Sequence, residues 1–232
     1  MNDLPKRNID KEEFLNKCKN PEFVQNIIDQ FDRLFYYSSA FGGTWKNLSW
    51  LGTPIQKHPF DCWIYQEILY TLRPDYIIET GTKVGGSTLF FANICDILNH
   101  GEVITVDIDH ADNLPQHNRI TYLTGSSIDG NIVNFISPRV KDKVVMVILD
   151  SDHSKQHVLK ELELYSKFVS VGSYIIVEDT NITGFPVIGT FEDGPLEAVI
   201  GFIKENKDFV IDRKCEKLYS TFDRCGFLMR IK

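Results

Sequence analysis

Short runs rich in β-branched residues recur along the middle of the chain, and each is separated from the next by a stretch long enough for a helix or a long turn. Runs of this composition are typical of parallel strands that are buried on both faces of a sheet. Between them, residues 87–98 and 154–168 carry apolar side chains at helical spacing, which indicates strand–helix–strand units. The pattern predicts an α/β fold with a doubly wound, mostly parallel sheet, whose strands are residues 76–80, 102–109, 119–125, 144–150 and 173–179.

The two ends of the chain have patterns of their own. Residues 217–222 ("KLYSTF") and 226–232 ("GFLMRIK") alternate apolar and polar side chains, which predicts an antiparallel C-terminal hairpin. Residues 21–35 have the spacing of an amphipathic helix, and an aromatic-rich segment follows. We expect residues 1–70 to form a cap segment and residues 71–232 a single compact domain. The aromatic segment can cover either the mouth of the sheet or an edge of its core.

Charge and composition exclude several classes of partner. The formal net charge is -7, and no Lys/Arg cluster follows a groove-reading motif, so nucleic acid is not an expected partner. The five cysteines are scattered without CxxC spacing and are expected to be reduced thiols. The N-terminus is polar where a signal peptide is apolar, and no apolar run approaches the ~20 residues of a membrane span. We expect a cytoplasmic protein that binds small molecules.

The stretch "YIIETGTKVGGS" places an acid, Glu79, and then several glycines at the carboxyl end of the first strand, where open α/β sheets bind ligands. These glycines do not match the dinucleotide fingerprint, because Lys83 stands where G-x-G-x-x-G requires a glycine. A carboxylate there repels a pyrophosphate and attracts a cation. S-adenosylmethionine carries both a sulfonium and an ammonium group. The predicted contacts of this cofactor are Glu79, Gly81, Thr82, Gly85, Gly86 and Ser87.

Two later strand ends extend the predicted cofactor site. Asp107 ends the second strand, where an acid can accept both ribose hydroxyls, and Ser126 and Ser127 follow the third within reach of adenine. Each residue also has a structural explanation: Glu79 can cap a helix, Asp107 can end a strand in water, and "GSS" is a common turn. Their order along successive strand ends favours one shared ligand.

Acidic residues crowd the next two strand ends. Asp150, followed by Asp152 and His153, ends the fourth strand, and Glu178 and Asp179 end the fifth. Because adjacent parallel strands end side by side, the repulsion among these carboxylates must be relieved by a divalent cation or by protonation. An all-oxygen set without cysteine favours Mg2+, with Mn2+ or Ca2+ as alternatives. Asp152 is explained more simply as a helix cap or a solvated residue.

Several longer motifs resemble those of a known family. They are "WLGTPIQKHPFDCWIYQEILYTLRPDYIIETGTKVGGSTLFFA", "ILDSDHS", "YIIVEDT", "GPLEAVIGFI" and "GFLMRI". In these motifs the chain, from about Trp45 to its C-terminus, resembles the cephalosporin hydroxylase family of S-adenosylmethionine-dependent methyltransferases. That family includes rhamnosyl O-methyltransferases and a protein implicated in cephalosporin 7-methoxylation. The resemblance implies a Rossmann-like class I methyltransferase fold, with Mg2+ (or Mn2+) held by Asp150, Glu178 and Asp179. The spacing is also similar to that of catechol O-methyltransferase, whose catalytic lysine corresponds to His153.

The resulting hypothesis is a Mg2+-dependent O-methyltransferase that acts on a hydroxyl of a sugar or another small-molecule or glycan acceptor. Asp150 would hold the metal that lowers the pKa of the hydroxyl, and His153 would take its proton. The alternative for His153 is a solvated residue near a helix start, and His157 is interpreted as a helix-surface residue. Trp45, Trp50, Trp63 and Tyr65 are candidates for stacking on the acceptor.

Two other functions compete with this hypothesis. A β-lactam hydroxylase is suggested by the family's name, but the sequence shows no pair of histidines with a carboxylate to hold iron. A binding protein that keeps the fold without turnover is the second alternative, although Glu79, Asp107 and the acidic cluster are all present. Because relatives commonly assemble, a homo-oligomer is expected.

Overall fold

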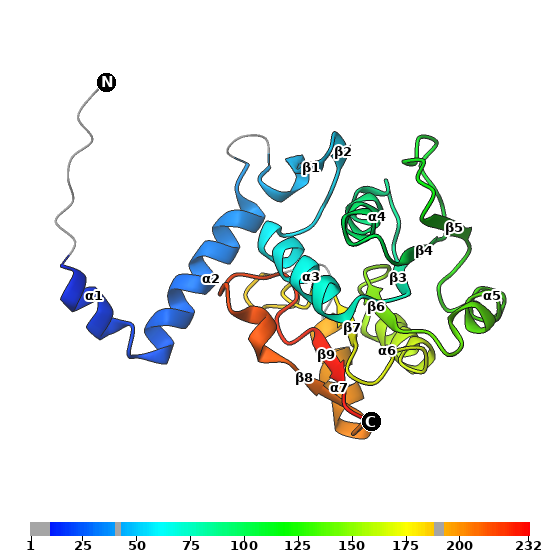
Figure 1. The fold of residues 1–232 in the computed structure, drawn as a ribbon. Helices are drawn as coiled ribbons and strands as arrows, with labels where there is room; N and C mark the ends of the chain where they lie inside the picture. The colour runs from blue at the N-terminus through cyan, green and yellow to red at the C-terminus, as the bar shows by residue number, and fades with distance from the viewer. Residues whose placement is uncertain (1–9, 40–42, 188–192) are drawn as a thin grey trace.

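A seven-stranded sheet forms the centre of the molecule, and helices cover both of its faces (Figure 1). The computed structural model describes residues 10–39, 43–187 and 193–232. The strand order is β5-β4-β3-β6-β7-β9-β8, and only the pairs that involve β9 are antiparallel. This confirms the predicted mostly parallel, doubly wound sheet with antiparallel C-terminal strands. The strands are β3 (Tyr76–Thr80), β4 (Glu102–Asp107), β5 (Ile120–Thr124), β6 (Val145–Leu149), β7 (Tyr174–Val177), β8 (Phe209–Ile211) and β9 (Phe227–Arg230).

The central strands are buried on both faces because successive side chains enter two different apolar layers. Ile77 packs in one layer with helices α3 and α4, whereas Ile78 packs in the other with α5, α6 and α7. Both isoleucines are fully buried, and all of β6 is buried as well. The five helices are α3 (Pro59–Leu72), α4 (Gly86–Leu98), α5 (Gly130–Val140), α6 (Lys155–Tyr165) and α7 (Pro195–Glu205).

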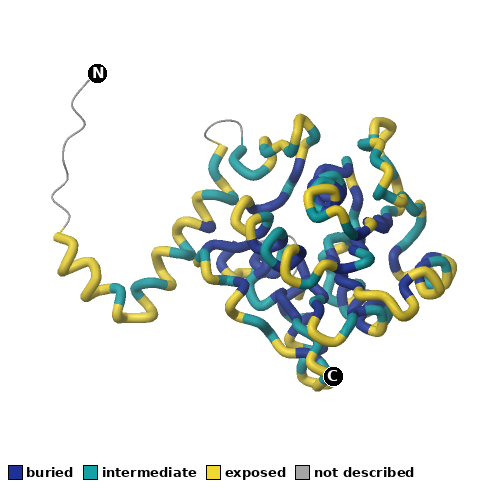
Figure 2. Tube along the Cα trace, viewed as in Figure 1, coloured by how far each residue is buried: buried dark blue, intermediate teal, exposed yellow. Residues whose placement is uncertain are grey.

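The two N-terminal helices project from the body of the molecule (Figure 1). Helices α1 (Lys11–Lys17) and α2 (Pro21–Tyr37) extend outward and are largely exposed (Figures 1 and 2). The short elements η2 (Trp45–Asn47), β1 (Ser49–Trp50) and β2 (Thr53–Pro54) then lead back to α3. The helix expected near residues 21–35 is therefore present.

Residues of the aromatic segment lie at both of the positions considered, the mouth of the sheet and the core. Trp45 lines a cavity at the mouth of the sheet. Trp50 covers the core instead: its Nε1 donates to Asn93 Oδ1 at 2.8 Å, and its ring meets Phe90 edge-on at 4.9 Å. Helix α3 spans the predicted boundary at residue 70 and buries Tyr65 in the core. The division into residues 1–70 and 71–232 stays a prediction.

The predicted C-terminal hairpin is wrong in its first strand. Residues 217–222 form no strand, and β9 pairs with β8 instead. The physical reason is a buried set of polar contacts: Thr221 Oγ1 and Phe222 N both donate to the Asp61 carboxylate, the latter at 2.9 Å, and Ser220 Oγ donates to Asp32. The alternating pattern thus arises from side chains that bind α2 and α3.

Within the described ranges, no helix has the length and apolar character needed to cross a membrane. All five cysteines are free, as expected for reduced thiols.

Candidate active site

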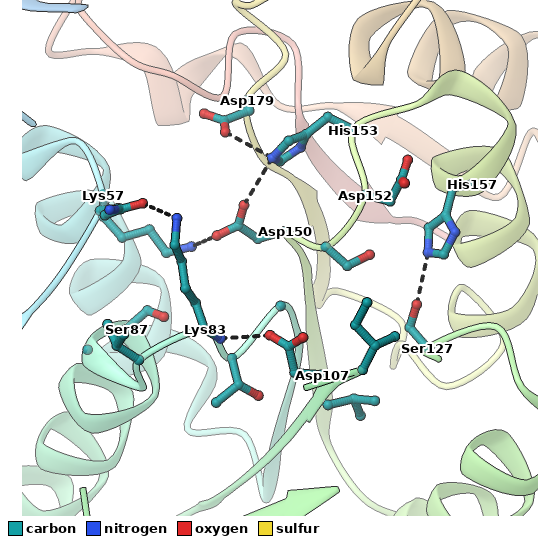
Figure 3. A pocket seen from close by; sticks show the side chains of 18 of the residues that line it. Lys57, Lys83, Ser87, Asp107, Ser127, Asp150, Asp152, His153, His157 and Asp179 are labelled. Atoms are coloured by element: carbon teal, nitrogen blue, oxygen red, sulfur yellow. Dashed lines mark hydrogen bonds and ion pairs between the residues drawn. The ribbon is translucent and has the colours of Figure 1, made fainter. Parts of the chain in front are cut away.

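A cavity of about 730 Å³ opens at the carboxyl ends of the parallel strands (Figure 3). Each of the five parallel strands contributes side chains to it through the residues that follow its end. The N-terminal segment supplies another part of the lining, with Tyr36, Trp45, Pro54, Gln56 and Lys57. The predicted site residues that line the cavity are Gly81, Thr82, Gly86, Ser87, Asp107, Ser126, Ser127, Asp150, His153 and Asp179. Glu79, Gly85 and Glu178 are not among the lining residues.

The glycines of the first turn are required by packing of the chain against itself. A Cβ on Gly81 would lie 1.8 Å from the carbonyl oxygen of Asp150, and one on Gly86 would lie 2.0 Å from that of Pro54. Gly85 has φ +78° and precedes α4, and a Cβ there would meet Pro115 at 2.7 Å. The close approach that these glycines permit is therefore to neighbouring backbone and a proline ring.

Glu79 lies behind the cavity wall. Its carboxylate is fully buried and accepts hydrogen bonds from Ser87 Oγ, Thr88 Oγ1 and Thr105 Oγ1. Burial raises the pKa of Glu79, and Lys57 and the hydroxyls oppose that shift. Because the Ser87 hydroxyl hydrogen is used by Glu79, the Ser87 oxygen has lone pairs left to accept from a ligand in the cavity. Direct contact between Glu79 and a cofactor ammonium stays a prediction.

The next two strand ends form one side of the cavity. Asp107 Oδ2 accepts from the backbone N–H of Lys83 at 2.7 Å, which ties the end of β4 to the glycine turn. Ser127 Oγ lies 3.0 Å from His157 Nε2, and the Ser127 carbonyl accepts from Tyr165 OH at 2.7 Å. Ser126 and Ser127 therefore stand at a wall that α6 holds in place.

His157 does not lie on an outer helix surface as interpreted from the sequence. It lines the cavity, and its Nε2 is 3.6 Å from the fully buried Glu161. The nearby Glu161 carboxylate raises the pKa of His157, and burial opposes that shift. The i,i+4 spacing of His157 and Glu161 is the signal that the sequence offers, because it places both on one helix face.

Asp150, His153 and Asp179 converge at the ends of β6 and β7. His153 Nε2 lies 3.3 Å from Asp179 Oδ2 and 3.9 Å from Asp150 Oδ1. One potential ligand atom from each residue lies within 4.8 Å of the others, an arrangement that can hold a cation. Burial raises the pKa of Asp179, and His153 opposes the shift. Asp152 is exposed, which agrees with its explanation as a solvated residue; its Oδ1 accepts from Ser154 N at 2.7 Å, and Ser154 is the N-cap of α6.

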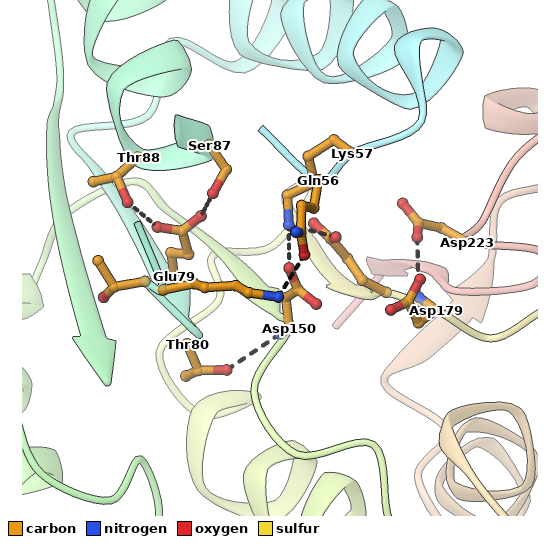
Figure 4. A network of polar contacts seen from close by, with 12 residues as sticks. Gln56, Lys57, Glu79, Thr80, Ser87, Thr88, Asp150, Asp179 and Asp223 are labelled. Atoms are coloured by element: carbon orange, nitrogen blue, oxygen red, sulfur yellow. Dashed lines mark hydrogen bonds and ion pairs between the residues drawn. The ribbon is translucent and has the colours of Figure 1, made fainter. Parts of the chain in front are cut away.

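Lys57 is the main residue that sequence reasoning missed. Its side chain is 4% exposed, and its Nζ contacts both Asp150 Oδ2 and Glu178 Oε2 (Figure 4). Burial lowers the pKa of Lys57, but Asp150, Glu178 and Glu79 outweigh it and raise the pKa well above its ordinary value. Lys57 is therefore a charged ammonium between two carboxylates. Lys57 lies within the longest of the quoted motifs, but nothing local marks it as a site residue, because its contacts join segments far apart in the sequence.

A tyrosine and a further acid continue the network behind Glu178. Tyr65 OH lies 2.9 Å from Glu178 Oε1 and also contacts Asp223 Oδ2. One hydroxyl hydrogen cannot serve two carboxylates, so one of the two acids carries a proton. Burial and Asp61 raise the pKa of Asp223 well above its usual range. Burial likewise raises the pKa of Glu178 well above its usual range, and Lys57 opposes the shift of both acids.

One of the four aromatic candidates for stacking lines the cavity. Trp45 does so together with Tyr36, whose ring stacks on it at 5.3 Å. Trp50 and Tyr65 are packed into the core, and Trp63 is exposed on α3. The aromatic wall of the cavity is therefore formed by Tyr36 and Trp45.

Comparisons of the sequence with known proteins identify one family. The sequence profile of the family described as "Rhamnosyl O-methyltransferase/CmcI" matches residues 42–231. A protein named rhamnosyl O-methyltransferase from Mycobacterium leprae is 35% identical over 217 residues, which cover 89% of this chain and 92% of that protein. One of the same name from Mycobacterium tuberculosis (strain ATCC 25618 / H37Rv) is 37% identical over 205 residues, with 84% and 82% covered.

Solved structures share the fold. The structure named "cmcI-D160 Mg-SAM" superposes with a TM-score of 0.61 at 20% identity and covers 81% of this chain and 78% of its own. A putative caffeoyl-CoA O-methyltransferase from Staphylococcus aureus gives a TM-score of 0.51 at 15% identity, with 86% and 90% covered. These likenesses confirm the Rossmann-like class I methyltransferase fold. The profile match and the curated relatives confirm the resemblance seen in the motifs, and the chain belongs to the Rhamnosyl O-methyltransferase/CmcI family.

Proposed function

We propose that the protein is a Mg2+-dependent, S-adenosylmethionine-dependent O-methyltransferase that acts on a hydroxyl of a sugar or a similar small acceptor. The observation that carries this proposal is that one cavity joins the predicted cofactor residues of β3, β4 and β5 to the acid–histidine cluster of β6 and β7. Membership of the family supports the reaction class. The names of the curated relatives support a rhamnose-like sugar as acceptor.

The cavity fits the cofactor in size and in the chemistry of its wall. A volume of about 730 Å³ lies within the range of small-molecule sites. Asp107 offers a carboxylate oxygen at the position expected for the ribose hydroxyls, and Ser126 and Ser127 with His157 line the part proposed for adenine. Ser87, backed by Glu79, offers a hydrogen-bond acceptor for the amino-acid end of the cofactor.

The acidic cluster fits a divalent cation. Asp150 and Asp179 bring carboxylate oxygens together, and Glu178 adjoins them through Lys57, so Asp150, Glu178 and Asp179 are the proposed ligands. A bound Mg2+ supplies positive charge that lowers the pKa of an acceptor hydroxyl beside it. In its neutral form, the His153 imidazole has a ring nitrogen that can accept that proton. The related structure "cmcI-D160 Mg-SAM", whose name gives both Mg and SAM, supports this pair of ligands in the fold.

The acceptor is proposed to lie between the aromatic wall and His153. Tyr36 and Trp45 give an apolar face on which a sugar ring can stack, and His153 and Asp179 line the same cavity. Transfer itself needs alignment of the hydroxyl with the methyl group and exclusion of water, because the sulfonium carries its own leaving group. The predicted cytoplasmic location and homo-oligomeric state stay predictions.

A screen of methyl transfer tests the proposal. S-adenosylmethionine with a labelled methyl group is incubated with the protein and a panel of rhamnosides, other glycosides and catechols. Label is expected in a hydroxyl of a glycoside, and its absence from every hydroxyl acceptor would contradict the proposal. A hydroxylase finds no comparable support, because the cation cluster found among the described residues contains one histidine where an iron facial triad takes two.

A further inference from the structure

Lys57 is a buried cation placed directly against the proposed metal ligands. It lies just before α3, and its side chain reaches between the ends of β6 and β7 (Figures 3 and 4). Its Nζ contacts one oxygen of Asp150 and one of Glu178. The other cavity-lining lysine, Lys83, directs its Nζ to Gln56 Oε1 instead. Among the described residues, Lys57 is therefore the lysine that makes direct ion pairs with this acidic cluster.

Because Lys57 is buried, its charge must be compensated by nearby carboxylates. Transferring an ammonium from water to a protein interior costs several kcal/mol unless carboxylates compensate for it. Here Asp150 and Glu178 both do so, and each keeps an oxygen for another partner: Asp150 Oδ1 faces His153, and Glu178 Oε1 accepts from Tyr65. Lys57 thus fixes two carboxylates that come from different strand ends.

The charges of the cluster also match those of a divalent ion. Asp150, Glu178 and Asp179 bring three negative charges when ionised, and Lys57 supplies one positive charge in contact with two of them. The two negative charges that remain equal the charge of Mg2+ or Mn2+. Without Lys57, the same three carboxylates would hold any cation more strongly and would repel one another more in its absence.

We propose that Lys57 is the built-in counter-cation of the metal site. It neutralises one of the three carboxylates, holds Asp150 and Glu178 in place when no metal is bound, and weakens the affinity of the site for divalent cations. It is a positioning residue, and the inference rests on the metal assignment of the proposed function. It predicts that removal of the Lys57 charge has opposite effects on the metal-free protein and on metal binding.

The test is the variant Lys57→Met, which keeps an unbranched side chain and removes the charge. Thermal unfolding and calorimetric titration with Mn2+ are measured on metal-free protein in the absence of cofactor. The metal-free variant is expected to melt at a lower temperature than the wild type, but to bind Mn2+ about 10-fold or more tightly, because a positive charge near the ion is gone. Lys217→Met removes a lysine from an exposed ion pair with Glu67 and should change neither quantity.

A second variant covers the case in which Lys57→Met does not fold. Lys57→Gln retains a hydrogen-bond donor without the charge and is expected to behave in the same way. If neither variant folds alone but Mn2+ restores folding, the inference is supported, and if Mn2+ restores neither, it is overturned. Unchanged or weaker Mn2+ affinity in a folded variant overturns the inference alone. A wild type that binds no divalent ion overturns it together with the metal assignment of the proposed function.

Discussion

His153 Nε2 lies 3.3 Å from Asp179 Oδ2, although the two residues follow different strands of the sheet. His153 follows β6 and Asp179 follows β7, and these strands are parallel neighbours whose carboxyl ends lie side by side. The contact places an imidazole beside the carboxylates proposed to hold Mg2+. It gives the proposed base an orientation that the sequence alone cannot supply.

Replacement of this base should slow the reaction without weakening cofactor binding. His153→Ala is expected to lose on the order of 10²-fold or more in turnover, the usual size of a general-base contribution. Steady-state kinetics and calorimetry with S-adenosylhomocysteine measure turnover and cofactor binding. His100→Ala removes a histidine that pairs with Asp75 outside the cavity and should change neither. Near-normal turnover of His153→Ala would make the residue structural.

The ribose assignment predicts a cofactor-binding defect for Asp107→Ala. Hydrogen bonds to a charged carboxylate contribute about 1.5–3 kcal/mol, so S-adenosylhomocysteine should bind roughly 10- to 100-fold more weakly. Calorimetry on the folded variant checks this, with Asp109→Ala, two residues away, as the control. Unchanged affinity of Asp107→Ala would show that the carboxylate does not hold the ribose. Equal affinity of the wild type for NAD would contradict the choice of cofactor.

Adding a methyl group at Gly81 should lower the free energy of unfolding more than adding one at Gly172. Gly81 and Gly172 have positive φ values of +92° and +83°, but a Cβ meets the Asp150 carbonyl at 1.8 Å only at Gly81 and finds nothing within 4 Å at Gly172. Gly172→Ala should lose about 1–2 kcal/mol of unfolding free energy, the usual cost of a left-handed residue. Gly81→Ala should lose more than about 3 kcal/mol, because the backbone of β6 must also move. Urea unfolding of both variants measures the difference, and equal losses would mean that the clash is relieved without cost.

His58 makes the stability of the protein depend on pH. It is buried at the start of α3, where its Nδ1 accepts from Phe60 N at 3.1 Å, and burial lowers its pKa from 6.5 to about 4. Between these two pH values His58 is more protonated in the unfolded chain than in the folded one. Its neutral burial therefore contributes fully to the free energy of unfolding above pH 6.5, and this contribution is lost as the pH falls to about 4. The lost stability amounts to about 3 kcal/mol.

The variant His58→Asn, which keeps a capping side chain, isolates this effect. The free energy of unfolding is measured for both proteins by urea denaturation at pH 7 and pH 4. The wild type should lose about 3 kcal/mol relative to the variant over that interval. A difference between the two proteins that stays constant with pH would mean that His58 is charged in the folded state.

The functional residues at the strand ends can be predicted from the sequence, whereas the residues that contact and orient them cannot. β3 and the acids that follow β6 and β7 are visible because β-branched runs that end on polar residues give a local signal. Lys57, Tyr65 and Asp223 have no such signal. The contacts of Lys57 and Tyr65 with Glu178, and of Tyr65 with Asp223, depend on how α3 and the C-terminal loop pack. The same loop has the alternating pattern of a strand, but its polar side chains bind helices α2 and α3 instead of forming a strand.

The glycines illustrate a different limit. Their number and position in the first turn correctly indicate a close approach of the backbone. The partner of that approach cannot be assigned from them, because a sequence does not show that the carbonyls of Asp150 and Pro54 fill the space beside Gly81 and Gly86. His157 is a similar case, since only the contact with Ser127 shows that its face of α6 is turned to the cavity.

The most direct test of the central claim is methyl transfer to a glycoside before and after removal of divalent metal. Labelled transfer from S-adenosylmethionine is measured on the wild type as purified, after treatment with EDTA, and after addition of Mg2+, with Glu178→Gln carried through the same steps. We predict that EDTA abolishes transfer by the wild type, that Mg2+ restores it, and that the folded Glu178→Gln protein is not restored. Transfer that continues unchanged after EDTA, or that Mg2+ restores equally in Glu178→Gln, would contradict the account.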